Sequence, residues 1–441
     1  MFLRLVDISK VPKMVLNHNI YIGNALECAH FLKNESIDCL VTSPPYWGPR
    51  DYNTPPQEWG GDPTCNHEFE PDTSGERCKI CGCWKGELGR EPTPNEYISH
   101  LCWIFEALTP KLKKTATMWI NIGDMYSGGV NNNDSIKEKR GSVEGVERIK
   151  GDAPPKSLLL IPTRFAWRMV EKGWILRNVI PWVKPSCIPS SVDDRYTVNW
   201  EYIFFFVRND VTTFWEHTKT KEMIYEKPPK IDEDPEGEGT NWEEVEKIVM
   251  DETGEMISIK RKVSLWKGRD YYFNMPYEPI AENTKKRYLS VGNLDKRKDG
   301  ISTDNGLGMS SKNNIECVAN MKKRIESGEQ LMRHARAVWE FSPVTEGAGS
   351  HFAAFPPELP KRAITAGCPL DGTVLDPFGG TGTTMKEARN QERNCVIFEL
   401  NEESVKKELV DKLRLKEQLP TGLINYKITN TLSHTVTEIQ G

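Results

Sequence analysis

Residues 373–384, TVLDPFGGTGTT, decide the fold of this chain. Their first residues predict a short apolar strand that ends in Asp376, and the three glycines predict a tight turn that leads into a helix over Met385–Gln391. Residues 395–398, CVIF, predict a second buried strand, and Glu399 ends it. A strand, a glycine turn, a helix and a second strand, with an acid closing each strand, is typical of a nucleoside site in a doubly wound sheet.

The glycine turn has the chemistry that a nucleoside requires. Glycines let the backbone come close to a ligand, and the N-terminus of the following helix adds partial positive charge. The second acid, Glu399, can accept hydrogen bonds from ribose hydroxyls. A plain β-turn would explain the glycines but not the two acids that end the strands.

The other strands of the sheet must come from upstream, because the chain after Asp376 is too short for a stable open sheet. Alternating α and β patterns predict an α/β fold with a doubly wound, Rossmann-like sheet. The predicted strands are 19–22, 37–42, 117–122, 174–183 and 201–207, and the predicted helices are 25–33, 95–108 and 161–171. Residues 128–156, rich in Gly, Asn and Lys, predict a mobile loop.

Ser43-Pro44-Pro45-Tyr46 follows the predicted strand 37–42, at the edge where such sheets bind ligands. Proline has no N–H, so this loop presents carbonyl oxygens without competing donors. Ser43 and the Pro44 carbonyl can therefore hold the exocyclic amine of a planar ligand whose ring stacks on Tyr46. A stiff turn that only closes the strand is the alternative.

A second cluster has the spacing of a metal site. Cys65-x-His67 is followed, after ten residues, by Cys78-x-x-Cys81, and Cys83 lies two residues further on. Two ligand pairs around a short loop predict a tetrahedral structural Zn²⁺ site, a knuckle stabilised by its metal. The predicted ligands are Cys65, His67, Cys78 and Cys81, with Cys83 able to replace His67, and a cluster of free thiols is the alternative.

The formal net charge of −5 conceals a strong local asymmetry. Residues 231–256 hold eleven acids and one lysine, whereas residues 257–330 hold fifteen bases and nine acids, with aromatic residues between the basic triplets. Positive charge with interleaved aromatics suits phosphate contact and base stacking, although a solvated charged insert is equally compatible with this composition. For the acidic segment, a solvated loop is the first interpretation, and DNA mimicry or shielding of the basic segment are the others.

Two broad classes are excluded by the sequence. No apolar run is long enough for a transmembrane helix, and the N-terminal residues lack the apolar core of a secretory signal. Eleven cysteines without a regular spacing predict a reducing, cytoplasmic environment rather than a disulfide framework.

Together the motifs resemble the amino-methylating DNA methyltransferases that use S-adenosylmethionine. Residues 376–383 are similar to the family's cofactor motif, whose core is Phe-x-Gly-x-Gly, and residues 43–46 are similar to its catalytic motif. The catalytic motif comes first and an insert separates the two, as in the permuted order of the β class. Residues 351–356 resemble the segment at the methionine end of the cofactor, and 182–185 with 201–203 resemble later family segments.

This resemblance implies an organisation in three parts. Residues 1–208 would form the catalytic part, with the zinc knuckle inserted at 60–90. Residues 209–335 would form an inserted target-recognition domain, and residues 336–441 the part that binds S-adenosylmethionine.

The resemblance also implies residue roles. Ser43, Pro44, Pro45 and Tyr46 would be catalytic, Glu399 would bind ribose, and Thr383 and Thr384 would cap the helix after the turn. Asn24 stands where the family often has Asp near the adenine, although an ordinary helix N-cap is an equal alternative. The implied cofactor residues are Asn24, His351, Phe352, Asp376, Phe378, Gly380, Gly382, Thr383, Thr384 and Glu399.

The activity implied is site-specific transfer of a methyl group to cytosine N4 in double-stranded DNA, by direct in-line attack on a flipped base. Serine at position 43 favours cytosine N4, whereas Asp or Asn is commoner in adenine-N6 enzymes. The alternatives are adenine N6, an RNA base or protein amide, and a non-catalytic zinc-bearing DNA-binding protein. A cognate restriction endonuclease is an expected partner, and a membrane is not.

Overall fold

The computed structural model describes residues 15–48, 52, 54–128, 152–187, 192–253, 255–290, 312–343, 355–405, 423–431, 433 and 435–440. The chain forms two compact units. Unit 1 comprises Met1–Asp210, Tyr271–Asn274 and Ala337–Gly441, and unit 2 comprises Val211–Asp270 and Met275–Arg336. Among the residues described, no helix is long and apolar enough to cross a membrane.

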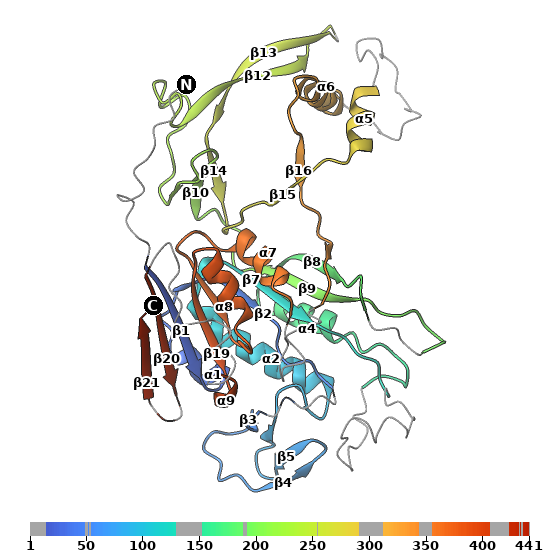
Figure 1. The fold of residues 1–441 in the computed structure, drawn as a ribbon, viewed down its shortest axis with the longest axis vertical. Coiled ribbons are helices and arrows are strands. Elements are labelled where there is room, and N and C mark those ends of the chain that lie inside the picture. The colour runs from blue at the N-terminus through green and yellow to red at the C-terminus, as the bar shows by residue number, and fades with distance from the viewer. Residues whose placement is uncertain are drawn as a thin grey trace. The chain divides into compact units, whose positions relative to one another are not determined.

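Unit 1 is built on a ten-stranded sheet in the order β17-β8-β9-β7-β2-β18-β19-β1-β20-β21 (Figure 1). Parallel pairs join β17 to β8 and run continuously from β7 through β2, β18, β19 and β1 to β20, whereas β9 and β21 are antiparallel to their neighbours. The strands are β1 (Val15–Ile22), β2 (Ile37–Thr42), β7 (Leu112–Ile122), β8 (Ile175–Val183), β9 (Trp200–Val207), β17 (Trp339–Glu340), β18 (Thr373–Asp376), β19 (Asn394–Glu399), β20 (Leu423–Asn430) and β21 (Thr435–Gln440).

The central position of β18 places the two sequence motifs side by side. Strand β18 pairs in parallel with β2 on one side and with β19 on the other. The glycine turn after Asp376 and the Ser43–Tyr46 loop after β2 therefore leave the same edge of the sheet from adjacent strands. In an open α/β sheet this edge is where ligands bind.

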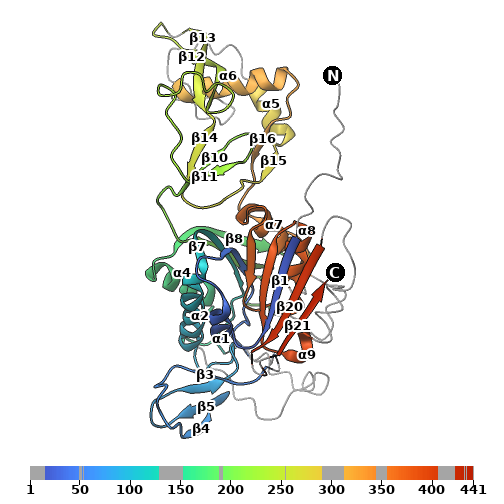
Figure 2. The same ribbon diagram turned by 90° about the vertical axis from the view of Figure 1, so that its left-hand side faces the viewer.

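Helices cover both faces of the sheet, so its strands are apolar on both sides (Figure 2). Strand β9 shows the consequence: Phe204 and Phe206 pack with α2 and α4, whereas Phe205 faces the layer of α7 and α8 and stacks on Trp119 with ring centroids 4.1 Å apart. The helices of unit 1 are α1 (Ala25–Cys28), the 3-10 turns η2 (Ala29–Phe31) and η3 (Thr109–Lys111), α2 (Pro94–Leu108), α4 (Ile161–Glu171), α7 (Glu358–Gly367), α8 (Thr383–Asn390) and α9 (Glu402–Ser404).

A small antiparallel sheet lies between β2 and α2 in the chain. Its order is β3-β6-β5-β4, and it carries the cysteine and histidine cluster. Its strands are β3 (Gln57–Trp59), β4 (Phe69–Asp72), β5 (Gly75–Cys78) and β6 (Trp84–Gly86). We call residues 57–91 the knuckle. Trp59 and Trp84 stack on His100 of α2, and their ring centroids lie 4.8 and 5.9 Å, respectively, from that of His100. This packing attaches the knuckle to the rest of unit 1.

Unit 2 is built of short sheets and two helices. Its central feature is a hairpin in which the acidic strand β12 pairs with the basic strand β13, so that Glu246 stands opposite Lys260. The elements are β10 (Phe214–His217), β11 (Met223–Ile224), β12 (Trp242–Met250), β13 (Met256–Ser264), β14 (Trp266–Arg269), β15 (Tyr277–Pro279), α5 (Glu282–Ser290), α6 (Lys312–Glu326) and β16 (Met332–His334).

Several predicted elements need correction. The acidic segment is not simply a solvated loop, because 242–250 forms β12 and its carboxylates meet the bases of the insert: Glu244 pairs with Lys260 and Glu246 with Lys323. Predicted helix 25–33 is one α-helical turn followed by a 3-10 turn. Most of the predicted loop 128–156 lies outside the described residues, and the C-terminal hairpin β20–β21 was not predicted.

Candidate functional site

A cavity of about 390 Å³ opens at the carboxyl edge of the large sheet, in the size range of small-molecule sites. It is lined by residues at or just after the carboxyl ends of β1, β19, β18, β2, β7 and β8 and by Glu201 near the start of β9. The lining includes Asn24, Ser43, Pro44, Pro45, Tyr46, Tyr52, Thr54, Gln57, Trp59, Leu88, Asn121, Lys184, Glu201, Phe355, Phe378, Gly380, Thr383 and Glu399.

The glycine turn is shaped by close packing and by two buried acids. A Cβ atom on Gly379 would lie 2.9 Å from the Cβ of Ile397, so only glycine fits between the turn and β19. Gly380 and Gly382 have φ values of +50° and +75°, a region that glycine adopts without strain. The backbone therefore curls over the end of β18 and lets Phe378 face the cavity.

Asp376 is the fully buried centre of this turn. Its Oδ1 accepts hydrogen bonds from Thr42 Oγ1 at 2.6 Å and from the amide of Phe378 at 3.1 Å, and its Oδ2 accepts from Thr384 Oγ1 at 2.6 Å. Burial raises the pKa of Asp376 to about 6, although these hydrogen bonds oppose the rise. Asp376 thus organises the turn instead of presenting a free carboxylate to a ligand.

The prediction that Thr383 and Thr384 cap the helix is wrong. The N-cap of α8 is Gly382, which has no side chain, and Thr384 turns back to Asp376. Thr383 lines the cavity and lies 3.4 Å from Thr381, measured between their Oγ1 atoms. The helix N-terminus is consequently left to a ligand, or to water, for its unsatisfied amides.

Glu399, at the end of β19, reaches into the cavity beside the turn. Its Oε2 accepts a hydrogen bond from the amide of Gly380 at 2.7 Å, and its Oε1 accepts from the amide of Asn401 at 2.8 Å. These bonds fix the carboxylate at the position where the sequence predicts contact with ribose hydroxyls.

Asn24 has the alternative role that the sequence left open. Its Oδ1 accepts a hydrogen bond from the amide of Leu26 at 2.8 Å, so it is the N-cap of α1, and it also lines the cavity. His351 and Phe352, the other two predicted cofactor residues, lie outside the described residues. Phe355, just after them, borders the cavity.

The loop of residues 43–46 faces the glycine turn across the cavity. Pro44 is buried, and the carbonyl of Pro45 accepts a 2.7 Å hydrogen bond from the hydroxyl of Tyr97. The Pro45 oxygen is thereby occupied within the protein. The Pro44 carbonyl, which the sequence predicts to accept a hydrogen bond from the amine of the ligand, takes no part in this bond.

Tyr46 is held by a polar network that the sequence did not predict. Its hydroxyl donates to Glu201 Oε2 at 2.7 Å and lies 3.0 Å from Asn121 Oδ1. Burial and the Glu201 carboxylate raise the pKa of Tyr46, so the phenol keeps its proton and acts as a donor. The ring also lies against Gly123, where a Cβ atom would come within 2.5 Å of it.

Glu201, Asn121 and Lys184 complete this network. The Lys184 ammonium pairs with Glu201, and Asn121 Nδ2 donates to the carbonyl of Tyr202 at 3.0 Å. The Ser43 hydroxyl lies 3.4 Å from the Tyr46 hydroxyl and 3.5 Å from Asn121 Oδ1, which leaves it available to a ligand. Sequence reasoning missed these roles, although the end of a predicted strand, where Asn121 and Lys184 lie, was the available signal.

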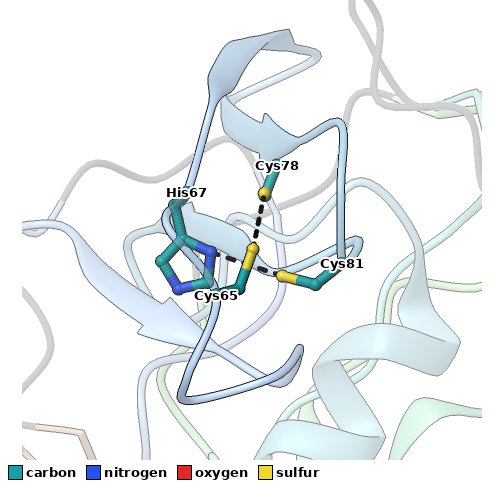
Figure 3. Close-up of side chains that lie close together, drawn as sticks. All are labelled: Cys65, His67, Cys78 and Cys81. Atoms are coloured by element: carbon teal, nitrogen blue, oxygen red, sulfur yellow. Dashed lines mark hydrogen bonds between the residues drawn. The ribbon is translucent and has the colours of Figure 1, made fainter.

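The predicted metal ligands gather in one place. Figure 3 shows Cys65, His67, Cys78 and Cys81 pointing toward one another, and their ligand atoms all lie within 4.8 Å of one another. The sulfurs of Cys65 and Cys78 are 3.9 Å apart, and Cys81 Sγ is 3.3 Å from His67 Nδ1. Cys83 is fully buried and belongs to a different group, with Glu58 and His67.

The surroundings of this cluster lower the pKa of Cys78 and Cys81, whereas burial and hydrogen bonds to the neighbouring cysteines raise the pKa of Cys65 to about 12. Although burial raises the pKa of Cys78, hydrogen bonds from the backbone at Cys81 and from His67 outweigh it and lower the pKa to about 6. The Gly82 amide donates to the Cys78 carbonyl, closing the tight turn that presents the pair. Three thiols and an imidazole at this spacing fit a tetrahedral Zn²⁺ ion.

Comparison with known proteins gives concordant matches over most of the chain. A family model described as DNA methylase, covering the N6 and N4 types, matches residues 37–410. Type II methyltransferase M.SmaI of Serratia marcescens is 28% identical, over 87% of this chain and 87% of its own length. Type II methyltransferase M.SfiI of Streptomyces fimbriatus is 25% identical, over 89% and 90%. The solved PvuII DNA methyltransferase (cytosine-N4-specific) aligns with a TM-score of 0.43 and 14% identity, over 89% of this chain and 86% of its own.

Proposed function

The chain belongs to the DNA methylase family of N6 and N4 type, and from this premise we propose that it methylates the exocyclic N4 amine of cytosine at specific sites in double-stranded DNA. The observation that carries the proposal is the shared cavity. The Ser43–Tyr46 loop and the glycine turn after Asp376 line it from adjacent strands, so an amine donor and a nucleoside-like methyl donor can meet there.

We place S-adenosylmethionine on the turn side of the cavity. Bound there, it supplies a methyl group on a positively charged sulfur. Glu399 would bind the ribose hydroxyls, Phe378 would pack on the adenine, and Asn24 would lie at the edge of the same site. Asp376 contributes by holding the turn through Thr42 and Thr384, instead of by touching the ligand.

The amine side must make a poor nucleophile react. The lone pair of an exocyclic amine is delocalised into the ring, and hydrogen bonds from the amine to Ser43 and to the Pro44 carbonyl favour its tetrahedral form. The nitrogen lone pair then forms the new N–C bond as the S–C bond breaks, its electrons returning to sulfur, and the amine afterwards loses one proton. Proximity supplies much of the rate, and no covalent intermediate with the protein is required.

Tyr46 would stack on the target base, and the base must leave the duplex to reach it. Glu201 and Asn121 hold the Tyr46 hydroxyl, which fixes the orientation of the ring. We assign recognition of the DNA sequence to unit 2, which contains most of the basic and aromatic residues of the insert. The type II relatives support a role in restriction and modification beside a cognate endonuclease.

Serine at position 43 supports cytosine N4 over adenine N6, the second candidate. The Ser43 hydroxyl is a neutral acceptor, so position 43 itself lacks the carboxylate or amide that adenine-N6 enzymes commonly carry there, although Asn121 and Glu201 lie nearby.

We further propose that Cys65, His67, Cys78 and Cys81 bind a structural Zn²⁺ ion. Four protein ligands close the coordination sphere, and transfer from a sulfonium needs no metal. The ion would stabilise a four-stranded sheet too small to hold itself together by burial alone.

The decisive experiment incubates the purified protein with unmethylated duplex DNA and labelled S-adenosylmethionine and identifies the nucleosides after digestion by mass spectrometry. N4-methylcytosine is expected. N6-methyladenine would retain the family and overturn the choice of base. Bound S-adenosylmethionine without any methylated base in DNA would overturn the substrate.

A further inference from the structure

Hydrogen bonds within the protein connect the knuckle to the Ser43–Tyr46 loop, and DNA takes no part in them. After β6 the chain continues through Glu87, Leu88, Gly89, Arg90 and Glu91 before α2 begins. This short stretch is almost entirely buried and lies along the loop of residues 43–48. It is connected to that loop in three places, one of them indirect, from Glu87 through Tyr52, and two of them direct, through the carbonyls of Gly89 and Glu91.

The first contact is made by Glu87, a residue that is 7% exposed. Its Oε1 accepts hydrogen bonds from the amide and the hydroxyl of Thr54, at 2.7 and 2.6 Å, and its Oε2 accepts from the amide of Tyr52 at 3.3 Å. The Tyr52 hydroxyl in turn accepts a hydrogen bond from the amide of Tyr46 at 3.0 Å. Glu87 therefore holds Tyr46 through one intermediate side chain.

The second and third contacts are made by the backbone around Gly89. The carbonyl of Gly89 accepts from the amide of Gly48 at 2.9 Å, and the carbonyl of Glu91 accepts from Trp47 Nε1 at 2.9 Å. A Cβ atom on Gly89, whose φ is +94°, would lie 2.8 Å from the carbonyl oxygen of Tyr46. The two backbones are thus packed as closely as glycine permits.

The same stretch is anchored at its far end by a buried pair. Glu91 is fully buried, and its Oε1 lies 2.9 Å from Nδ1 of His100, while its Oε2 accepts from the amide of Gly89 at 2.9 Å. The His100 ring is stacked against Trp59 and Trp84 of the knuckle. The proposed metal ligands lie in β5 and the loops around it, and β5 pairs with β6, so the small sheet connects the cluster to Glu87, the residue that follows β6.

We propose that the knuckle holds the catalytic loop in place, and that Glu87 is a positioning residue that sets the place of Tyr46 through Tyr52, with Thr54 as the second partner that fixes the Glu87 carboxylate. This inference rests on the proposed function. In this proposal the Glu87 carboxylate, which takes no part in the reaction, keeps the base-binding side of the cavity correctly placed relative to the methyl donor. A displacement of about 1 Å between reacting groups lowers the rate by about 100-fold, so loosening this contact should slow the methyl-transfer step.

The test compares Glu87→Ala, Glu87→Gln and Thr54→Val with wild type, and uses Glu70→Ala as the matched control. Glu70 lies on β4 of the small sheet, is exposed, and pairs with Lys79 at 3.3 Å. Three quantities are measured: the single-turnover rate of methyl transfer to DNA, the dissociation constant of S-adenosylmethionine, and hydrogen exchange of the amides in 43–48.

For Glu87→Ala we expect the transfer rate to fall by about 10- to 100-fold, with faster exchange in 43–48 and an unchanged dissociation constant. Glu87→Gln should recover part of the rate, because its amide oxygen can still accept from Thr54. Thr54→Val, which keeps the shape and the backbone amide of Thr54, should show a smaller loss of the same kind. Glu70→Ala should behave as wild type in all three measurements.

Unchanged exchange in 43–48 for Glu87→Ala would overturn the proposal, as would losses of rate and cofactor affinity in equal proportion. Loss of bound zinc from Glu87→Ala would also overturn it, because Glu87 would then support the knuckle instead of the loop. A wild-type protein that methylates no DNA would refute the proposed function alone, since the exchange measurement still decides whether Glu87 holds the loop.

Discussion

The hydroxyl of Thr42 donates a 2.6 Å hydrogen bond to Asp376, although 334 positions separate the two residues in the chain. Thr42 ends β2 and Asp376 ends β18, so this bond ties together the two loops that line the cavity. Both side chains are buried, and the bond therefore has no competition from water.

Thr42→Val should destabilise the protein by about 1 to 3 kcal/mol, because it removes one partner of a buried carboxylate while keeping the side-chain shape. The measurement is urea unfolding of unit 1. Thr365→Val, which removes an exposed hydroxyl on α7, serves as the control and should change stability by no more than about 0.5 kcal/mol. Equal effects of the two changes would contradict the importance of the Thr42–Asp376 bond.

Asp376 should make the folded state lose stability as the pH rises from about 4 to about 6. An unfolded aspartate has a pKa near 3.9, whereas burial raises the pKa of Asp376 to about 6, so folding takes up a proton in this interval. The stability of Asp376→Asn relative to wild type should therefore increase by about 2 to 3 kcal/mol across it. The exposed Asp371→Asn is the control, and a flat difference for Asp376→Asn would contradict the raised pKa.

Phe378→Ala should weaken binding of S-adenosylmethionine by about tenfold or more, because the ring supplies apolar surface at the glycine turn. Isothermal titration calorimetry measures the dissociation constant directly. The matched control is Phe31→Ala, whose ring is 51% exposed and does not line the cavity. An unchanged dissociation constant would place the cofactor elsewhere.

Tyr46→Phe should lower the rate of methyl transfer by about 10- to 100-fold with little change in cofactor affinity, because the hydroxyl bonds to the charged Glu201. Phenylalanine has no hydroxyl to donate to Glu201, so the ring at position 46 loses the hydrogen bond that fixes its orientation, and the pair of Glu201 and Lys184 loses this donor. Single-turnover kinetics and calorimetry separate the two quantities. Tyr426→Phe, which removes a phenol that accepts from Arg389 away from the cavity, should leave both unchanged.

Metal analysis of the purified protein should find about one zinc ion per chain. Cys65→Ser should abolish the stoichiometric zinc and lower the thermal stability, whereas Cys317→Ser, which changes an exposed cysteine of α6, should do neither. Zinc retained in full by Cys65→Ser would remove Cys65 from the ligand set. Absence of zinc from the wild type would favour the cluster of free thiols.

The parts of the site that could be predicted are those encoded by short stretches. The glycine turn needs Gly379 and its neighbours because of contacts with the adjacent strand, and such local requirements produce a short sequence motif that can be recognised. Cys65, His67, Cys78 and Cys81 were identified by spacing alone, because the loop between two ligand pairs must have a restricted length. The sequence predicts that both motifs end strands of the same sheet, and the parallel pairing of β2 with β18, which was not predicted, makes them neighbours.

The parts that could not be predicted depend on distant pairings. Glu201 reaches Tyr46 across 155 positions, and although residues 201–203 resemble a family segment, that resemblance does not predict the bond to Tyr46. The acidic and basic runs of unit 2 resemble solvated segments individually, and only the register of β12 with β13 brings Glu246 opposite Lys260. Thr384 seemed a helix cap because of its position, but the buried Asp376 provides a stronger acceptor.

The position of β18 between β2 and β19 has a consequence for biosynthesis. A ribosome releases β1 and β2 early, but the two strands that separate them in the finished sheet, β18 and β19, are made only when residues 373–399 emerge. Until then one edge of β2, a strand whose residues are all buried in the finished fold, is unpaired, and an unpaired edge is a template for aggregation. Expression yield should accordingly depend on slow synthesis or on chaperones, and truncation before residue 373 should give insoluble protein.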